Sequence, residues 1–373
     1  MKTLYPDYQN SIANLACSIL RYYGADSPNN GTLPLADDVL RREYKNIVVL
    51  LLDGMGQNIL EANLEPDGFF RRNLRGIYSS VFPPTTVAAT TSIDSGLFPN
   101  QHGWLGWECY YKDIDKNVTV FLNTVQDTKE PAADYNVPRT FCPYVSVIDR
   151  LKAVGVEAYY STPFERPFPQ DFNAVCDRVA ELCAQSGRKY VYAYWNEPDH
   201  VMHMNGILAE KTVVLLRKLE KRTEELCEAL SDTLLIVTAD HGQIDSEIAV
   251  VTDYPDIMEC LTRMPSIEPR ALNLYVKDGC EKKLISAFTE HFGGRFKLFA
   301  KKEVKNLQLF GHGANHPRFD EMLGDYLAVS TDSLTMFNTA RQIVGVHAGL
   351  TEDEMLIPFI TVECGRKPQK SKN

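Results

Sequence analysis

Carboxylate and imidazole side chains follow several apolar stretches of this sequence, at the points where buried strands would end. They are Asp53, Asp199, His203, Asp240 and His241, and a further histidine, His347, precedes the last apolar stretch. In α/β sheets, ligands bind at the carboxyl ends of the strands, so we expect these side chains to meet at one edge. Histidine nitrogen and aspartate oxygen are ligands of zinc, and aspartate-rich sites also suit manganese or magnesium. The residue types therefore predict a metal site.

The spacing within this group is consistent with shared ligation. Asp199 and His203 are four residues apart, so one helical turn would direct both toward one ion. Asp240 and His241 are adjacent, which requires a tight turn, and the glycine that follows permits one. Other histidines remain alternatives: His312 and His316 compete with His347 for the role of third ligand, and His200 neighbours Asp199.

A threonine-rich segment after a proline pair supplies the candidate nucleophile. Residues 80–91 read SVFPPTTVAATT, and the second half can form a helix that begins near Thr86. The N–H groups and the dipole of a helix N-terminus favour a bound anion. A threonine oxygen bound to a metal is a competent nucleophile, because coordination lowers its pKa. The alternative is that Thr85 or Thr86 only caps the helix.

The elements that would position these residues are short apolar strands that alternate with amphipathic helices. Strands are predicted over 46–52, 189–195, 233–239, 326–330 and 356–362. Helices are predicted over 145–154, 176–186 and 208–230. This alternation predicts an α/β fold with a mostly parallel central sheet and helices on both faces.

One stretch interrupts this rhythm. It contains strand-like residues 271–277 and 295–301 on either side of a helix-like segment, 281–292. This pattern predicts a small α+β cap insertion over residues 265–320. The predicted catalytic core then comprises residues 1–264 and 321–373.

Length and composition limit the classes of function further. The chain has 373 residues and a net charge of −10, with no basic stripe for a nucleic-acid backbone, so we expect no nucleic-acid polymer as partner. The sequence has no apolar run long enough to span a membrane and no apolar region of a secretion signal. Nine cysteines without a CxxC pair favour reduced thiols in the cytoplasm. A monomer and a homodimer are both compatible with the sequence.

The order of the candidate residues resembles the alkaline phosphatase superfamily, and within it the type I phosphodiesterase/nucleotide pyrophosphatase branch. The shared order is Asp53, Thr86, Asp199 with His203, Asp240-His241-Gly242 and His347-Ala348-Gly349, within residues 45–360. Residues 95–99 and His102-Gly103 also resemble the family's nucleophile segment, which implies Thr86 rather than Thr85 as the nucleophile.

This resemblance implies an alkaline-phosphatase-like core and a site with two zinc ions, manganese being the alternative metal. It assigns Asp53, Thr86, Asp240 and His241 to one ion, and Asp199, His203 and His347 to the other. The implied activity is hydrolysis of a small phosphoric ester, of the phosphodiesterase or nucleotide pyrophosphatase kind, through a phosphothreonine intermediate.

The sequence also departs from the family pattern. The nucleotide-hydrolysing members carry an asparagine where this chain has Trp107, so nucleotide specificity does not follow from the resemblance. Phe82, Trp104, Leu105 and Trp107 instead predict an apolar wall that suits the second ester group of a diester.

Other activities on the same core remain alternatives. A phosphomonoesterase, phosphonate hydrolase or phosphomutase would need an additional positive charge, for which Arg42 and Arg318 are the candidates. A non-hydrolytic transferase of phosphoryl headgroups is the third class.

Overall fold

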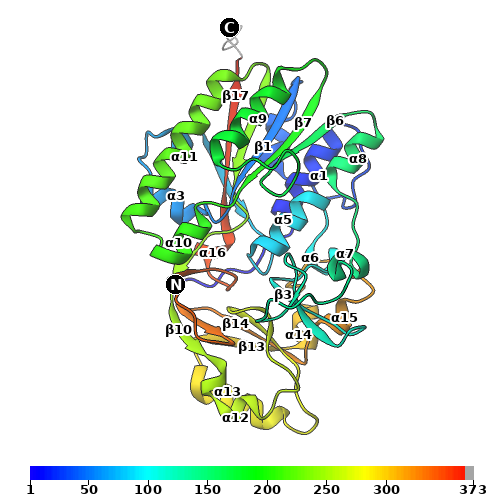
Figure 1. The fold of residues 1–373 in the computed structure, drawn as a ribbon, viewed down its shortest axis with the longest axis vertical. Helices are drawn as coiled ribbons and strands as arrows, with labels where there is room; N and C mark the ends of the chain where they lie inside the picture. Colours follow the sequence, from blue (N-terminus) through cyan, green and yellow to red (C-terminus); the bar gives the residue numbers. More distant parts are fainter. Residues whose placement is uncertain (366–373) are drawn as a thin grey trace.

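The computed structural model describes residues 1–365, so the last eight residues of the predicted core, 366–373, lie outside the described residues. One lobe is built around a six-stranded sheet with the strand order β2-β17-β8-β1-β7-β6 (Figure 1). In that order the strands are Leu74–Ser79, Leu356–Cys364, Thr233–Thr238, Asn46–Leu52, Lys189–Trp195 and Glu157–Ser161.

The register of the central strands aligns the ends that carry the candidate ligands. Strand β1 pairs in parallel with β7 from Asn46↔Lys189 to Leu52↔Trp195, and with β8 from Asn46↔Thr233 onward. Apart from the half-buried Trp195 at the end of β7, all three strands are buried along their length, as expected for strands covered on both faces. Their carboxyl ends therefore meet at one edge of the sheet, and the predicted mostly parallel sheet is confirmed.

The prediction of parallel pairing was wrong for two strands. Strand β17 runs antiparallel to both of its neighbours, β8 and β2. Strand β14 (Tyr326–Ser330) belongs to the second sheet, where it also pairs antiparallel. Both are short buried apolar runs, and burial on both faces does not encode strand direction. Strands β2 and β6 were not predicted, because both are only partly buried and carry polar residues among the apolar ones.

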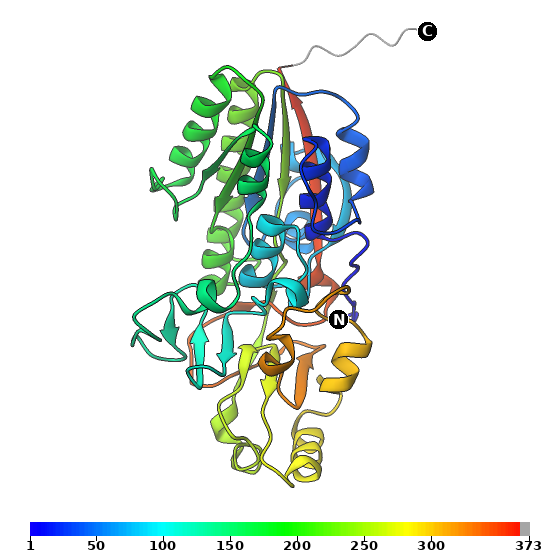
Figure 2. The ribbon, with the colours of Figure 1, turned by 90° about the vertical axis from the view of Figure 1, so that its right-hand side faces the viewer.

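Helices cover both faces of this sheet. Figure 2 shows α9 (Phe172–Ala184) and α11 (Glu210–Ala229) on one face and α1 (Ile12–Tyr22) on the other. In α11, the residues Leu216, Leu219 and Leu226 are buried, and charged residues face away from the core. Helix α1 packs against α5 (Thr86–Ser95), whose first residue is the candidate nucleophile.

The second lobe lies at the carboxyl edge of the first sheet (Figures 1 and 2). It is a seven-stranded antiparallel sheet with the order β13-β14-β12-β11-β3-β4-β5. In chain order its strands are β3 (Glu108–Tyr111), β4 (Lys116–Thr119), β5 (Thr124–Val125), β11 (Ser266–Glu268), β12 (Ala271–Leu274), β13 (Phe296–Ala300) and β14. The predicted cap residues, 265–320, supply β11, β12 and β13, so they form one sheet with strands from two other parts of the chain.

The remaining helices are distributed over both lobes. They are α2 (Pro34–Val39), α3 (Gln57–Asn63), α4 (Phe69–Arg72), α6 (Pro99–His102), α7 (Val137–Phe141), α8 (Val147–Ala153), α10 (Asp199–Asn205), α12 (Pro255–Met258), α13 (Glu281–Phe292), α14 (Lys301–Asn306), α15 (Phe319–Met322) and α16 (Glu352–Met355). Among residues 1–365, none of the helices combines the length and the apolar composition that crossing a bilayer would need.

Two small two-stranded sheets complete the fold. One pairs β10 (Glu247–Val250) with β15 (Leu334–Phe337), and the other pairs β9 (Ile244–Asp245) with β16 (Gly345–Val346). Because β16 ends just before His347 and β9 begins just after His241, the second pairing brings these two histidines together.

Candidate active site

The structure brings all seven predicted site residues to the carboxyl edge of the parallel sheet. Asp53 follows β1, and Asp240 with His241 follows β8. The other four come from α10 (Asp199 and His203), from the segment after β16 (His347) and from the start of α5 (Thr86).

Three of these residues form one group of potential metal ligands. One ligand atom from each of Asp199, His203 and His347 lies within 4.8 Å of the others. Nε2 of His203 is 3.1 Å from Oδ2 of Asp199, and Nε2 of His347 is 3.7 Å from Oδ1 of the same residue. The i,i+4 spacing on α10 therefore directs Asp199 and His203 to one point.

A second group adjoins the first. Asp53, Asp199 and His241 also bring one ligand atom each within 4.8 Å of the others. Nε2 of His241 lies 3.4 Å from Oδ1 of Asp53 and 3.5 Å from Oδ2 of Asp240. The rings of His241 and His347 are stacked with centroids 3.8 Å apart, so the two groups are contiguous.

Backbone carbonyl groups orient all three imidazole rings. Nδ1 of His203 lies 2.7 Å from the Gly345 oxygen, and Nδ1 of His241 lies 3.0 Å from the Gly242 oxygen. Nδ1 of His347 is 3.2 Å from the oxygen of Pro84. When each Nδ1–H donates to its carbonyl, each Nε2 presents a lone pair to the centre, as metal-bound histidines do.

The electrostatics of the centre fit bound cations. Burial raises the pKa of Asp53 well above its usual value, and the nearby carboxylates of Asp240 and Asp199 raise it further. Burial also raises the pKa of Asp240, whose Oδ2 is buried without a hydrogen-bond partner. Buried carboxylates in such proximity are costly unless a positive charge compensates them. The donor set and the unpartnered oxygen therefore fit divalent metal ions of the zinc or manganese type.

The histidines already compensate one of the carboxylates. Burial alone would raise the pKa of Asp199, but the adjacent His203 outweighs it and holds this pKa below its usual value. Burial lowers the pKa of His347 well below its usual value, and the neighbouring His241 lowers it further. A neutral His347 is the form that binds a metal.

Thr86 is placed to act on a ligand of this centre. Its Oγ1 lies 3.3 and 3.4 Å from the two carboxylate oxygens of Asp53, and 3.3 Å from Nε2 of His241. As the first residue of α5 it lies where the helix has N–H groups without intrahelical partners. The neighbouring Thr85 faces elsewhere, because its hydroxyl donates to Oε1 of Glu268 at 2.6 Å.

Two glycines permit the turns that carry the ligands. Gly54, after Asp53, has φ +74°, and a Cβ there would press on Asp199. Gly242, the residue after His241, packs so closely against α16 that a Cβ there would overlap the carbonyl oxygen of Asp353. The glycine that the sequence suggested for a tight turn is therefore required by close backbone packing.

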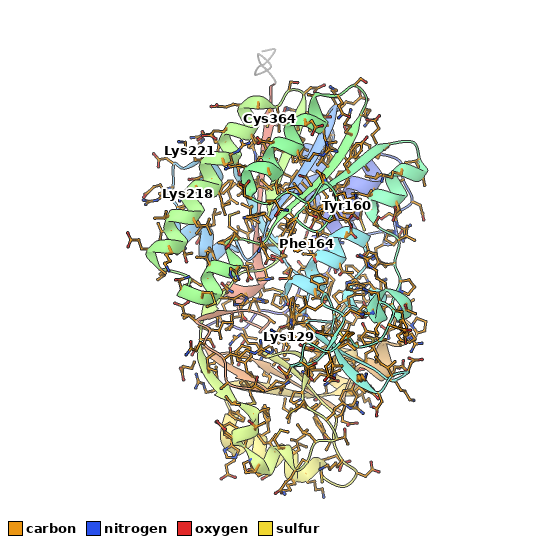
Figure 3. The ribbon with its side chains drawn as sticks, in the orientation of Figure 1. Lys129, Tyr160, Phe164, Lys218, Lys221 and Cys364 are labelled. Atoms are coloured by element: carbon orange, nitrogen blue, oxygen red, sulfur yellow. The ribbon has the colours of Figure 1, made fainter. Side chains whose placement is uncertain are left out.

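A cavity of about 570 Å³ opens from this centre. Several aromatic side chains line it: Trp107, Phe121, Tyr144, Tyr160, Phe164, Tyr192, Tyr194 and Phe337. Figure 3 shows Tyr160 and Phe164 at the end of the parallel sheet nearest the second lobe. Of the predicted apolar wall only Trp107 lines the cavity, since Phe82, Trp104 and Leu105 are buried in the core.

Two acidic residues of the cavity were not predicted. Glu268, on β11, accepts hydrogen bonds from Thr85 and from the N–H of Trp107, and burial raises its pKa to about 7. Asp94, two turns after Thr86 on α5, also lines the cavity, and burial raises its pKa to about 6. Neither stands in a recognisable motif, so no local signal in the sequence identified them.

The remaining sequence candidates lie outside the two ligand groups. His200 lines the cavity but belongs to neither ligand group. The ring of His312 packs on Phe98, and Nδ1 of His316 accepts from the N–H of Arg318. The two cation candidates are also outside the cavity: Arg42 pairs with Glu363, and Arg318 pairs with Asp113 and Glu321. The positive charges that do line it are Arg139 and Arg341.

Solved structures of other proteins share this fold. Human ectonucleotide pyrophosphatase/phosphodiesterase 5 superposes with a TM-score of 0.65 at 14% identity, over 84% of this chain and 87% of its own. An inactive variant of the murine protein in complex with AMP gives 0.64 at 15% identity, over 86% and 88%. Phosphonoacetate hydrolase from Sinorhizobium meliloti, in complex with phosphonoacetate, gives 0.61 at 15% identity, over 87% and 90%.

Comparison of the sequence with family models gives the assignment. No curated protein sequence matches the chain significantly. The model of type I phosphodiesterase/nucleotide pyrophosphatase matches residues 47–283, which is more than half of the chain and includes Asp53, Thr86 and the Asp240-His241 pair. His347 lies beyond that match, and the pairing of β16 with β9 brings it to the site. The chain thus belongs to the type I phosphodiesterase/nucleotide pyrophosphatase family, a family of phosphoric ester hydrolases.

Proposed function

We propose that this protein hydrolyses small phosphodiesters, with Thr86 as the nucleophile and two divalent metal ions, zinc or manganese, at the site. The observation that carries the proposal is the position of Oγ1 of Thr86, 3.3 Å from Nε2 of His241 and 3.3 Å from the nearer Asp53 oxygen, at the start of α5. Asp53, Thr86, Asp240 and His241 would hold one ion, and Asp199, His203 and His347 the other. When bound, such ions lower the pKa of a coordinated hydroxyl and neutralise charge on phosphoryl oxygens.

The proposed hydrolysis has two steps. In the first, Oγ1 of Thr86 forms a bond to phosphorus, its proton leaves to solvent, and the bond from phosphorus to the leaving oxygen breaks. The N–H groups in the first turn of α5 face the phosphoryl oxygens and donate to them. In the second step, a water oxygen bonds to phosphorus and the bond to Oγ1 breaks; the water loses a proton and Oγ1 takes one up, which returns the free threonine and a phosphate monoester.

The charges around the cavity favour a diester over a monoester. Five acidic side chains besides the ligands line it, namely Asp94, Glu108, Asp127, Glu165 and Glu268, against two arginines. Burial raises the pKa of Glu108 to about 8 and that of Glu268 to about 7, so these two are not fully ionised near neutral pH. One of these arginines, Arg341, is already paired with Asp127 at 2.9 Å. A monoester dianion carries one more negative charge than a diester, and this lining offers little to stabilise it.

Turnover of chromogenic esters tests the proposal. Metal-loaded protein should hydrolyse bis(p-nitrophenyl) phosphate with a higher kcat/KM than p-nitrophenyl phosphate, and should release no phosphate from phosphonoacetate. The same preparation stripped of metal serves as the control and should be inactive. Faster hydrolysis of the monoester or of the phosphonate would contradict the proposed diesterase activity, and no turnover of any of them would contradict the proposed chemistry.

A further inference from the structure

The cavity extends from Thr86 along one face of α5 to a carboxylate. Thr86, Thr90 and Asp94 are spaced four residues apart and therefore lie on the same face of this helix. All three line the cavity. Eight residues of α-helix span about 12 Å, so Asp94 lines this pocket about 12 Å along the helix from the nucleophile.

Two tyrosines hold the Asp94 carboxylate in place. The Tyr160 hydroxyl donates to Oδ1 at 2.6 Å, and the Tyr144 hydroxyl donates to Oδ2 at 3.1 Å. A carboxylate can accept about four hydrogen bonds, so each oxygen keeps a lone pair for a further donor. Within residues 1–365, Asp94 takes part in no ion pair, and the nearby Arg139 makes none either.

Aromatic rings line the pocket near this carboxylate. Tyr160 lies on β6, and Phe164 follows in the next loop with 68% of its surface exposed (Figure 3). The ring of Tyr192, which also lines the cavity, lies 6.1 Å from that of Tyr160. The ring of Phe164 packs instead on Tyr194, whose hydroxyl donates to Asp53 at the nucleophile end. A carboxylate among aromatic faces is the arrangement that binds a cationic nitrogen or a flat ring carrying N–H donors.

We infer that Asp94 is a specificity-determining residue, and that it selects phosphodiesters whose second ester group ends in a nitrogen that donates hydrogen bonds. The inference rests on the proposed function of the same site. Two kinds of group share this chemistry, an alkylammonium group and the amino group of an aromatic heterocycle. An ester group that ends in a carboxylate or a phosphate is disfavoured where it would face the Asp94 carboxylate.

Matched pairs of p-nitrophenyl diesters test the inference. One pair carries aminohexyl or hexyl as the second ester group, and the other carries adenosine or the purine riboside that lacks the amino group. A hydrogen bond to a charged group is worth about 1.5–3 kcal/mol, so the wild-type protein should prefer the nitrogen-bearing member of at least one pair by roughly 10- to 100-fold in kcat/KM. The pair that shows the preference identifies the source of the nitrogen.

Substitution of the carboxylate should remove this preference. In Asp94→Asn the aminohexyl-to-hexyl ratio should fall to about one, and in Asp94→Ala both ratios should do so. Glu165→Gln removes one negative charge from the same cavity without changing Asp94, and it should keep the wild-type ratios. If the Asp94 variants fail to fold, Tyr144→Phe with Tyr160→Phe removes the two donors that position the carboxylate and lower its pKa, so this double variant should lower the ratio.

Binding separates this inference from the catalytic proposal. Aminohexyl phosphate and hexyl phosphate, the monoester products, can be titrated into the metal-loaded protein by calorimetry. Tighter binding of the amine to the wild type, lost in Asp94→Asn, supports the inference even if no diester is turned over. Equal affinities for both phosphates, and equal kcat/KM within each diester pair, would overturn it even if bis(p-nitrophenyl) phosphate is hydrolysed.

Discussion

The hydroxyl groups of Thr85 and Thr86 face different surroundings, although the two residues are adjacent. Oγ1 of Thr86 faces Asp53 and His241, whereas the Thr85 hydroxyl donates to Glu268. We therefore expect Thr86→Ala to lower kcat by about 10³-fold or more, because loss of a nucleophile leaves only binding and charge stabilisation. Steady-state turnover of bis(p-nitrophenyl) phosphate measures this effect.

The matched control is Thr85→Ala, which removes the neighbouring hydroxyl and leaves Oγ1 of Thr86 in place. Its kcat should stay well above that of Thr86→Ala. The reverse order of the two activities would show that the nucleophile is Thr85.

Asp94 makes a second prediction at the residue scale, in the pH dependence of stability. Burial raises its pKa in the folded protein to about 6, whereas an unfolded aspartate titrates near 3.9. The folded state therefore binds this proton more tightly, and the stability it contributes is complete below about pH 4 and is lost as the pH rises through about 6. The loss amounts to at most about 3 kcal/mol.

Urea unfolding of the wild type and of Asp94→Asn across this pH range measures the effect. The asparagine cannot ionise. The free energy of unfolding of the variant, relative to that of the wild type, should therefore increase as the pH rises from about 4 to 7. A difference between the two proteins that stays constant with pH would show that Asp94 is not perturbed.

The residues that could be predicted from the sequence are those that lie in short motifs. The geometry of the Asp240-His241-Gly242 turn, and that of the i,i+4 pair of Asp199 and His203, can be predicted from a few consecutive residues. Glu268 and Asp94 could not be predicted, because one reaches the site only when β11 of the second lobe packs beside Thr85, and the other stands in an otherwise ordinary helix.

At the scale of elements, the packing of one turn makes the third prediction. A Cβ at Gly242 would overlap the carbonyl oxygen of Asp353, so Gly242→Ala should displace the Asp240-His241 turn from α16. We expect a loss of about 3 kcal/mol in the free energy of unfolding, as for overpacked core sites, and weaker metal binding. Chemical unfolding and metal analysis of the purified variant measure the two effects.

Gly155→Ala is the control for this variant. A Cβ there meets nothing within 4 Å, but φ is +81°, so only the strained backbone costs about 1 kcal/mol. Its metal content should equal that of the wild type. Equal metal content in Gly242→Ala would contradict the role of the turn.

The sequence predicted the elements better than their arrangement. The apolar run of β1 was predicted with its observed bounds, because burial on both faces leaves a continuous apolar signature. The direction of β17 and the membership of β14 in the second sheet depend on pairings between distant parts of the chain, which no local pattern encodes.

At the scale of the whole molecule, the metal site joins the ends of two strands, two helices and the β16 segment, so metal binding should stabilise the fold. Removal of metal leaves the buried Asp53 and Asp240 uncompensated. Zinc at 1,000 times its dissociation constant would add about 4 kcal/mol to the free energy of unfolding. A thermal melt of chelator-treated protein should therefore show a lower Tm, which zinc or manganese restores.

Elemental analysis of protein purified without chelator complements the melt and should find two ions per chain. A Tm that is insensitive to chelator and to added zinc, manganese and magnesium would contradict the assignment of these residues as metal ligands.

The central claim is that Thr86 becomes covalently bonded to phosphorus during turnover. The most direct test is to quench the metal-loaded protein in acid while it hydrolyses bis(p-nitrophenyl) phosphate, digest it, and map the modified peptide by mass spectrometry. The expected result is a p-nitrophenyl phosphoryl group on Thr86. The same group on another residue, such as Thr85 or Thr90, would contradict the claim. The absence of the group from Thr86 would also contradict it, under conditions in which the intermediate is hydrolysed slowly enough for the quench to trap it.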